Sequence, residues 1–115
     1  AVDLGPPLTV FDWEKRQDAL REGAFLVNTT ILGMTGMAPL ELDLASLPTA
    51  ASVCDVVYAP LETPLLAEAR ARGNLTIDGL GMLLHQARPG FEAWFGRAPD
   101  VTERLRQAVL NAMGH

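Results

Sequence analysis

The chain has 115 residues, which is enough for one hydrophobic core but hardly for two. Apolar residues make up 49% of it and charged residues 20%, a balance that argues against a disordered tail and favours a packed globular fold. The net charge is -5 and the nine Lys and Arg residues are scattered, which argues against nucleic acid as a partner because phosphate binding needs clustered cations.

The first part of the chain predicts two strands with a helix between them. Residues 8–11 form a short strand candidate, and Asp12 follows as the N-cap of a charged helix that we expect to end near Gly23 in a left-handed C-cap. Residues 25–27 are apolar on both faces, which is typical of a parallel strand covered by helices on each side. Residues 28–48 contain too many glycines and prolines for a long helix, so we expect a loop there.

The middle of the chain predicts a strand, a helix and a third strand. A second two-sided apolar run covers residues 53–58. Thr63 and Pro64 are a good N-cap and N1 pair for a helix that ends at Gly73, and residues 75–77 follow as a short buried strand. Because strands that alternate with helices pair in parallel through right-handed crossovers, this order predicts an α/β fold.

Two helices are expected in the last part of the chain. From Gly79 onward, apolar residues recur at steps of three and four, as they do on one face of a helix. This stripe consists of Leu80, Leu84, Ala87, Phe91 and Trp94. Pro89 is expected to kink this helix or to split it in two. Asp100 and Glu103 resemble a capping box, which predicts a last helix over residues 101–113.

Polar residues or glycines follow each of the three central apolar runs. In open parallel sheets, ligands bind beyond the carboxyl ends of the strands. Residues 28–30 (Asn-Thr-Thr), Tyr58 and residues 78–79 (Asp-Gly) occupy these positions, which predicts a ligand cleft. The alternatives are a local turn at residues 28–30, a core aromatic at Tyr58 and a simple helix entry at residue 79.

A second polar face is predicted on the helix that begins at Gly79. Gly79, Met82 and Gln86 are three and four residues apart and therefore share one face. A Met beside an amide suits a flat ring and a hydroxylated ligand, while the alternative is a packing face against another domain. His85 has no neighbours at the spacing of metal ligands or of a nucleophile and base pair, so we predict no catalytic residue and no metal site.

Three segments resemble the shikimate dehydrogenase family. They are residues 27–34 (VNTTILGM), residues 55–66 (DVVYAPLETPLL) and residues 78–87 (DGLGMLLHQA). The resemblance extends through Phe91, Trp94 and Gly96 and covers roughly residues 25 to 98. Three motifs in the right order make a specific signal.

The resemblance implies an enzyme that reduces 3-dehydroshikimate to shikimate with NADPH in aromatic amino acid biosynthesis. It also implies a partial Rossmann-like parallel sheet flanked by helices, with C-terminal closing helices. The family residues that match Tyr58 and Gln86 contact the substrate. The family residues that lie against the cofactor match Thr29, Thr30, Val56, Gly79 and Met82.

Other parts of the family pattern have no match in this sequence. The glycine-rich phosphate loop, the basic motif that binds the 2′-phosphate, and the catalytic lysine and aspartate cannot be placed. We therefore expect residues 1–78 to be the C-terminal half of a nucleotide-binding domain and residues 79–115 to be helices that pack toward an N-terminal substrate domain. The chain alone is expected to be inactive and, with apolar surface uncovered, to self-associate.

Two functional alternatives stay open. One is a dehydrogenase that acts on quinate or on both ring acids, and the other is a non-catalytic nucleotide-binding or regulatory module. No apolar run approaches the ~20 residues that span a bilayer, so we expect no membrane association. The single cysteine, Cys54, lies in an apolar run and is expected to be buried, which together with the lack of a recognisable leader favours the cytoplasm.

Overall fold

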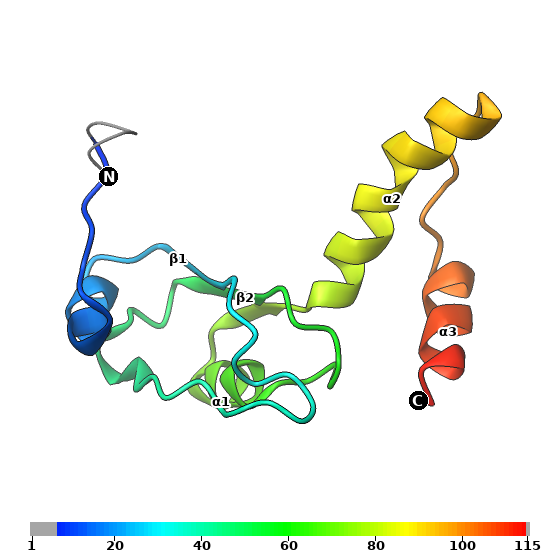
Figure 1. Cartoon of the computed structure of the whole chain (residues 1–115). Coiled ribbons are helices and arrows are strands. Elements are labelled where there is room, and N and C mark those ends of the chain that lie inside the picture. Colours follow the sequence, from blue (N-terminus) through cyan, green and yellow to red (C-terminus); the bar gives the residue numbers. More distant parts are fainter. Residues whose placement is uncertain (1–6, 115) are drawn as a thin grey trace.

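The computed structural model describes residues 7–114 and contains a three-stranded sheet with helices around it (Figure 1). The elements in chain order are η1 (Trp13–Leu20), β1 (Phe25–Asn28), η2 (Leu44–Ser46), β2 (Ser52–Asp55), α1 (Pro64–Arg72), β3 (Leu75–Ile77), α2 (Gly79–Phe95) and α3 (Glu103–Ala112). The strand order is β1-β2-β3 and both strand pairs are parallel. The predicted α/β fold with a parallel sheet is confirmed.

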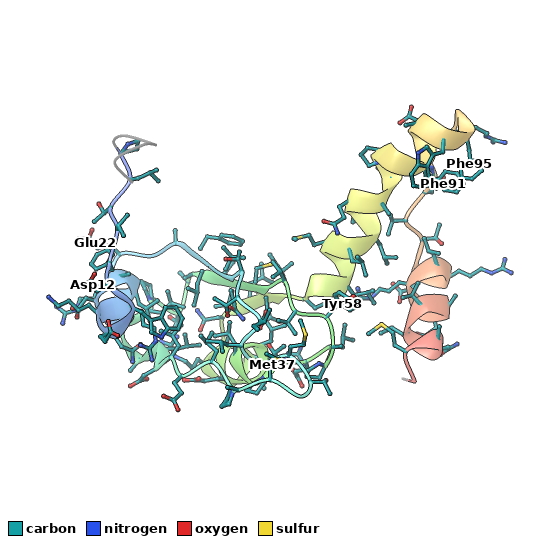
Figure 2. The ribbon with its side chains drawn as sticks, in the orientation of Figure 1. Asp12, Glu22, Met37, Tyr58, Phe91 and Phe95 are labelled. Carbon is teal, nitrogen blue, oxygen red and sulfur yellow. The ribbon has the colours of Figure 1, made fainter. Side chains whose placement is uncertain are left out.

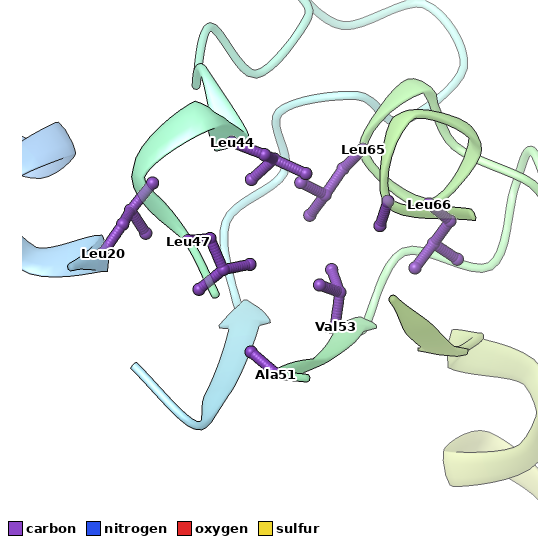
Figure 3. Packing of buried hydrophobic residues seen from close by; sticks show 8 residues of the cluster. Leu20, Leu44, Leu47, Ala51, Val53, Leu65 and Leu66 are labelled. Atoms are coloured by element: carbon purple, nitrogen blue, oxygen red, sulfur yellow. The ribbon is translucent and has the colours of Figure 1, made fainter. Parts of the chain in front are cut away.

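One hydrophobic core lies between the sheet and the helices on one of its faces (Figure 3). The 3₁₀ helices η1 and η2 and the helix α1 supply its leucines, and β2 supplies Val53, which is completely buried. The buried members are Leu20, Leu44, Leu47, Ala51, Val53, Leu65, Leu66 and Ala69. The sheet is thus packed on this face against η1, η2 and α1.

The opposite face of the sheet is apolar but open. Val27, Cys54 and Ile77 are aligned across the three strands, and the side chains of Val27 and Ile77 are 41% and 42% exposed. Phe25 and Leu75, which lie two residues earlier in β1 and β3, are also exposed. The expected helix cover on both faces of residues 25–27 is therefore not met within residues 7–114, although Cys54, which lies between Val27 and Ile77 on this face, is buried.

The expectations for the first part of the chain are partly wrong. Residues 8–11 are not a strand, because within the described residues no neighbouring strand pairs with them. The following helix is a 3₁₀ helix that ends at Leu20, and the side chain of Asp12 makes no capping hydrogen bond. Gly23 is not left-handed; instead an added Cβ would lie 3.3 Å from a side-chain carbon of Leu47, so the position favours a small residue for packing.

The helix α1 follows the prediction at both ends. The Thr63 hydroxyl accepts a hydrogen bond from Leu66 N–H, Pro64 occupies the first turn, and the helix ends at Gly73. Gly73 has a φ of 91°, a left-handed conformation in which a Cβ atom is strained. These signals are local to the helix ends, which is why the sequence predicts them well.

Asn74 joins the end of α1 to the segment before β2. Its buried side-chain amide donates hydrogen bonds to the carbonyl oxygens of Pro48, Thr49 and Ala51 at 3.0, 3.3 and 2.9 Å.

We expect Asn74→Ala to lower the free energy of unfolding by about 2 kcal/mol, because buried carbonyl groups lose their donor. Urea unfolding followed by circular dichroism measures this, and a loss no larger than that of an exposed Asn111→Ala control would contradict it.

The helix α2 projects away from the sheet on the side opposite α1, and α3 runs back beside it (Figure 1). We expected Pro89 to kink the helix α2 or to split it, and α2 is not split, because it continues through Pro89 to Phe95. The predicted capping box of the last helix is wrong, because Thr102 and not Asp100 is its N-cap, with its hydroxyl accepting a hydrogen bond from Leu105 N–H. Among the described residues, no helix combines the length and the apolar character that crossing a membrane requires.

Candidate functional site

A buried hydrogen-bond network joins the carboxyl ends of β1 and β2. Asp55 is completely buried, and its Oδ1 accepts hydrogen bonds from Asn28 Nδ2 at 3.1 Å and from the Val57 N–H at 3.0 Å. Its Oδ2 accepts a hydrogen bond from Thr63 Oγ1 at 2.7 Å. Because Thr63 is the N-cap of α1, one carboxyl group fixes the end of β1, the segment after β2 and the start of α1.

The predicted cofactor residues Thr29 and Thr30 lie in the turn after β1. Asn28 Oδ1 accepts hydrogen bonds from the backbone N–H and the hydroxyl of Thr30, at 3.0 and 2.7 Å. The same hydroxyl accepts a hydrogen bond from Leu32 N–H at 3.1 Å. The local-turn interpretation is therefore confirmed for Asn28 and Thr30, whereas Thr29 is exposed.

A hollow of about 230 Å³ lies between the segments that follow β1 and β2. Its wall consists of Thr29, Thr30, Ile31, Met34, Val56, Val57, Tyr58 and Ala59. Tyr58 is 40% exposed there, so it is not a core aromatic. A hydrogen bond from Thr35 N–H to the Ala59 carbonyl, 2.8 Å long, holds the two segments together. The hollow thus brings together predicted site residues from two strand ends.

Gly79, the first residue of α2, packs against the backbone that follows β2. A Cβ atom added at Gly79 would lie 2.8 Å from the carbonyl oxygen of Val57 and closer still to that of Val56. The space beside this glycine is therefore filled by the protein's own backbone. This contact places the start of α2 next to the segment that carries Tyr58 (Figure 2).

The other predicted residues of α2 lie away from this hollow. Met82 is 46% exposed near the start of the helix, and Gln86 lines a separate hollow of about 540 Å³ between α2 and α3. That hollow is mostly apolar and includes Phe91 and Phe95, whose rings are 4.6 Å apart at the far end of α2 (Figure 2). The two hollows share no residue. The structure therefore does not place Tyr58 and Gln86 in one crevice.

Asp78 sits at the foot of α2 and pairs with Arg106 of α3. Asp78 Oδ1 accepts hydrogen bonds from Gly81 N–H and from Arg106 Nη1, both 3.2 Å long, and its Oδ2 accepts one from Arg106 Nη2 at 2.6 Å. Partial burial works to raise the pKa of Asp78, but the hydrogen bonds from Arg106 and Gly81 outweigh it and lower the pKa below its ordinary value. The carboxylate in turn raises the pKa of Arg106.

This lowered pKa predicts a loss of stability in acid. The folded state favours the charged form of Asp78 more than the unfolded state does. The stabilisation that Asp78 gives the fold is therefore fully present above its unfolded pKa of about 4, and it is lost as the pH falls through its lower, folded pKa. We expect the free energy of unfolding to decrease less steeply below about pH 4 in Asp78→Asn than in the parent. Urea midpoints measured over a series of acid pH values test this, and parallel profiles for the two proteins would refute it.

Other reactive groups show no sign of a catalytic arrangement. Cys54 is a free, buried cysteine, as predicted, and burial together with the nearby Asp55 and Asp78 raises the pKa of its thiol, which disfavours the reactive thiolate. His85 is exposed on α2. Within residues 7–114, no group of three or more His, Cys, Asp or Glu residues gathers as metal ligands would.

Comparison with known proteins places these elements in a family. The family model described as Shikimate 5'-dehydrogenase C-terminal domain matches residues 79–110. The shikimate dehydrogenase (NADP(+)) of Paramagnetospirillum magneticum is 62% identical over 111 residues, which is 96% of this chain and 40% of that protein. The enzyme of the same name from Rhodospirillum rubrum is 62% identical over 90% of this chain and 37% of its own length. The chain belongs to the shikimate dehydrogenase family.

Solved structures of the shikimate dehydrogenase family and its neighbours share the fold. The quinate dehydrogenase of Corynebacterium glutamicum, solved with NAD, is 38% identical with a TM-score of 0.76 over 85% of this chain and 34% of that one. The shikimate 5-dehydrogenase of Thermus thermophilus, solved with NADP(H) and shikimate, is 36% identical with a TM-score of 0.66 over 73% of this chain and 32% of that one. The chain thus spans about two fifths of the length of the curated relatives it matches.

Two structural residues of this chain were not singled out from the sequence. Asp55 was noticed only as part of a motif, and its buried contacts depend on the register that places Asn28 beside it. Arg106 was not noticed, because its partner Asp78 lies 28 positions earlier and no local spacing connects the two. From the sequence, Arg106 is only one of the positive charges of an amphipathic helix, and nothing in its neighbourhood indicates an ion pair with Asp78.

Proposed function

We propose that the protein carrying this chain is an NADP-dependent shikimate dehydrogenase, which interconverts 3-dehydroshikimate and shikimate in aromatic amino acid biosynthesis. The observation that carries the proposal is the contact of Gly79 with the backbone of Val56 and Val57, which joins the start of α2 to the wall of the strand-end hollow. The names of the relatives at 62% identity support the same reaction.

The hollow after β1 and β2 fits one part of the cofactor. Its wall combines apolar groups from Val56 and Met34 with the threonine side chains after β1, and it contains no basic residue. Such a wall suits an uncharged ring or a sugar, and the phosphate groups would contact other parts of the protein. When bound, the nicotinamide accepts or supplies the hydride, and we propose that Thr29, Thr30, Val56, Gly79 and Met82 hold the cofactor.

The substrate would contact Tyr58 and Gln86, whose hydroxyl and amide can hydrogen-bond a hydroxylated ring acid. Both side chains are exposed at the surface of this chain. In this proposal, residues 1–78 are half of the nucleotide-binding domain and residues 79–115 face an N-terminal substrate domain, which also supplies the catalytic lysine and aspartate. The first six residues and His115 lie outside the described part of the chain.

The test is turnover by the full-length protein. We expect it to oxidise NADPH when 3-dehydroshikimate is added, and we expect Gln86→Ala to raise the KM for shikimate about ten-fold by removing a substrate hydrogen bond. His85→Ala is the matched control, because His85 is the neighbour of Gln86 on the same helix and has no assigned role. No turnover of 3-dehydroshikimate by the well-folded full-length protein would overturn the proposal.

A quinate-active enzyme is the second candidate. The likeness to the quinate dehydrogenase of Corynebacterium glutamicum favours it, with a TM-score of 0.76. Steady-state rates of the full-length protein with shikimate and with quinate, each with NADP and with NAD, separate the two candidates. A preference for quinate with NAD would replace the first proposal.

The isolated chain provides a test of the non-catalytic alternative. We expect it to bind NADP and shikimate only weakly, because the proposed site is completed by other parts of the protein, and tight binding of either would favour a binding module.

We also propose that the isolated chain self-associates through its open apolar surfaces, and a monomer in light scattering at high concentration would count against this. A cytoplasmic location stays part of the proposal.

A further inference from the structure

The ion pair between Asp78 and Arg106 is the main polar link from α3 to the rest of the chain. Its two hydrogen bonds join the two terminal guanidinium nitrogens, Nη1 and Nη2, to one carboxylate oxygen each, and the side chains of Asp78 and Arg106 are only 27% and 25% exposed. No residue of α3 is buried. The pair therefore fixes a helix that apolar packing alone holds weakly.

The same carboxylate determines how α2 begins. Asp78 is the N-cap of α2 and accepts a hydrogen bond from Gly81 N–H, while the next residue, Gly79, rests on the backbone of Val56 and Val57. A helix is a stiff rod that rises 1.5 Å per residue, so a small change of angle at its foot moves each later turn by a larger distance. Met82 and Gln86 lie on the first and second turns above this foot.

We propose that Arg106 is a positioning residue that orients α2 through Asp78 and so places Met82 and Gln86 for the reaction. The inference rests on the proposed function, because it uses the cofactor role of Met82 and the substrate role of Gln86. An arginine suits this task because its planar fork can hold both carboxylate oxygens at once and resist rotation about the pair. A lysine would hold one oxygen and leave the angle free.

The experiment compares Arg106→Gln with Arg104→Gln in the full-length protein. Arg104 lies on the same helix, carries the same charge and is exposed, so it controls for the loss of a positive charge. Hydrogen exchange measures the amides of the first turns of α2, with the amides of α1 as an internal reference. Steady-state turnover is measured with NADPH and with NADPH deuterated at the transferred position.

We expect Arg106→Gln to speed exchange in the first turns of α2 about ten-fold without changing α1, and to lower kcat about ten-fold with a larger deuterium isotope effect, because misplacing the reacting groups slows hydride transfer itself. Arg104→Gln should change neither. A simple loss of folded protein would lower kcat with an unchanged isotope effect, and that result would overturn the proposal.

Two further variants test the route through Asp78. Asp78→Asn keeps a good N-cap but loses the ion pair, so the double variant with Arg106→Gln should be no worse than either single variant. Additive effects would overturn the proposal, as would full recovery of activity in Arg106→Lys. If the parent protein does not turn over 3-dehydroshikimate, the proposed function fails, while the exchange measurement still decides whether Arg106 fixes α2.

Discussion

Asp55→Ala should destabilise the protein by about 3 to 5 kcal/mol, which is a large part of the stability of a small domain. The carboxyl group of Asp55 is completely buried and accepts hydrogen bonds from Asn28, Val57 and Thr63. Alanine removes these acceptors and leaves the Val57 N–H and the Thr63 hydroxyl without an acceptor, while the Asn28 amide keeps only its hydrogen bond to the Leu32 carbonyl. The effect should appear as a lower urea midpoint in far-ultraviolet circular dichroism.

Asp43→Ala is the matched control for this experiment. Asp43 is exposed, and its side chain accepts one hydrogen bond from Ala45 N–H as the N-cap of η2. The loss of such a cap should cost about 1 kcal/mol. If Asp55→Ala destabilised the protein no more than Asp43→Ala, the buried network would not have the structural role that we assign to it.

Gly79→Ala should lower the free energy of unfolding by about 1 to 3 kcal/mol, because its new methyl group overlaps backbone atoms that cannot rotate away. The added Cβ would lie 2.8 Å from the Val57 carbonyl oxygen and closer to that of Val56. The start of α2 must then move away from β2. In the full-length protein we also expect weaker binding of NADP, since this contact positions the hollow beside Tyr58.

Gly81→Ala, two residues later on the same helix, is the control. Outside its chain neighbours and the backbone of its own helix, no atom lies within 4 Å of the position that its Cβ would take. Alanine favours the helix over glycine, so this variant should be unchanged or up to about 1 kcal/mol more stable. Equal losses of stability in the two variants would show that the tight contact at Gly79 is not the cause.

Sequence reasoning succeeded where the signals were local. The helix α1 has a capping threonine, a proline in its first turn and a terminal glycine, and each satisfies a backbone requirement within a few residues of itself. The presence of the three strands was also predicted from short apolar runs between turn residues, but the expected burial of residues 75–77 was wrong, because Leu75 and Ile77 are exposed. The turn at Asn28 and Thr30 was among the alternatives, and local hydrogen bonds explain it.

The errors arose where distant parts of the chain decide the outcome. Residues 8–11 are apolar enough for a strand, but a strand needs a neighbour with which to pair. For the candidate site, the strand-end pattern correctly predicted that residues 29–30 and Tyr58 lie close together, since they line one hollow. It did not reveal the ion pair of Arg106, because only the packing of α3 alongside α2 brings that side chain to the start of α2.

Trp94, near the end of α2, is a natural fluorescence probe of this part of the protein. Trp94 is 82% exposed, next to the apolar hollow between α2 and α3, whereas Trp13 lies on η1 at the other end of the chain. An indole in water emits at longer wavelength than one in an apolar contact and is more easily quenched by acrylamide. A Trp13→Phe variant would leave Trp94 as the sole tryptophan, so a blue shift of its emission with less quenching would show when another protein surface covers the end of α2.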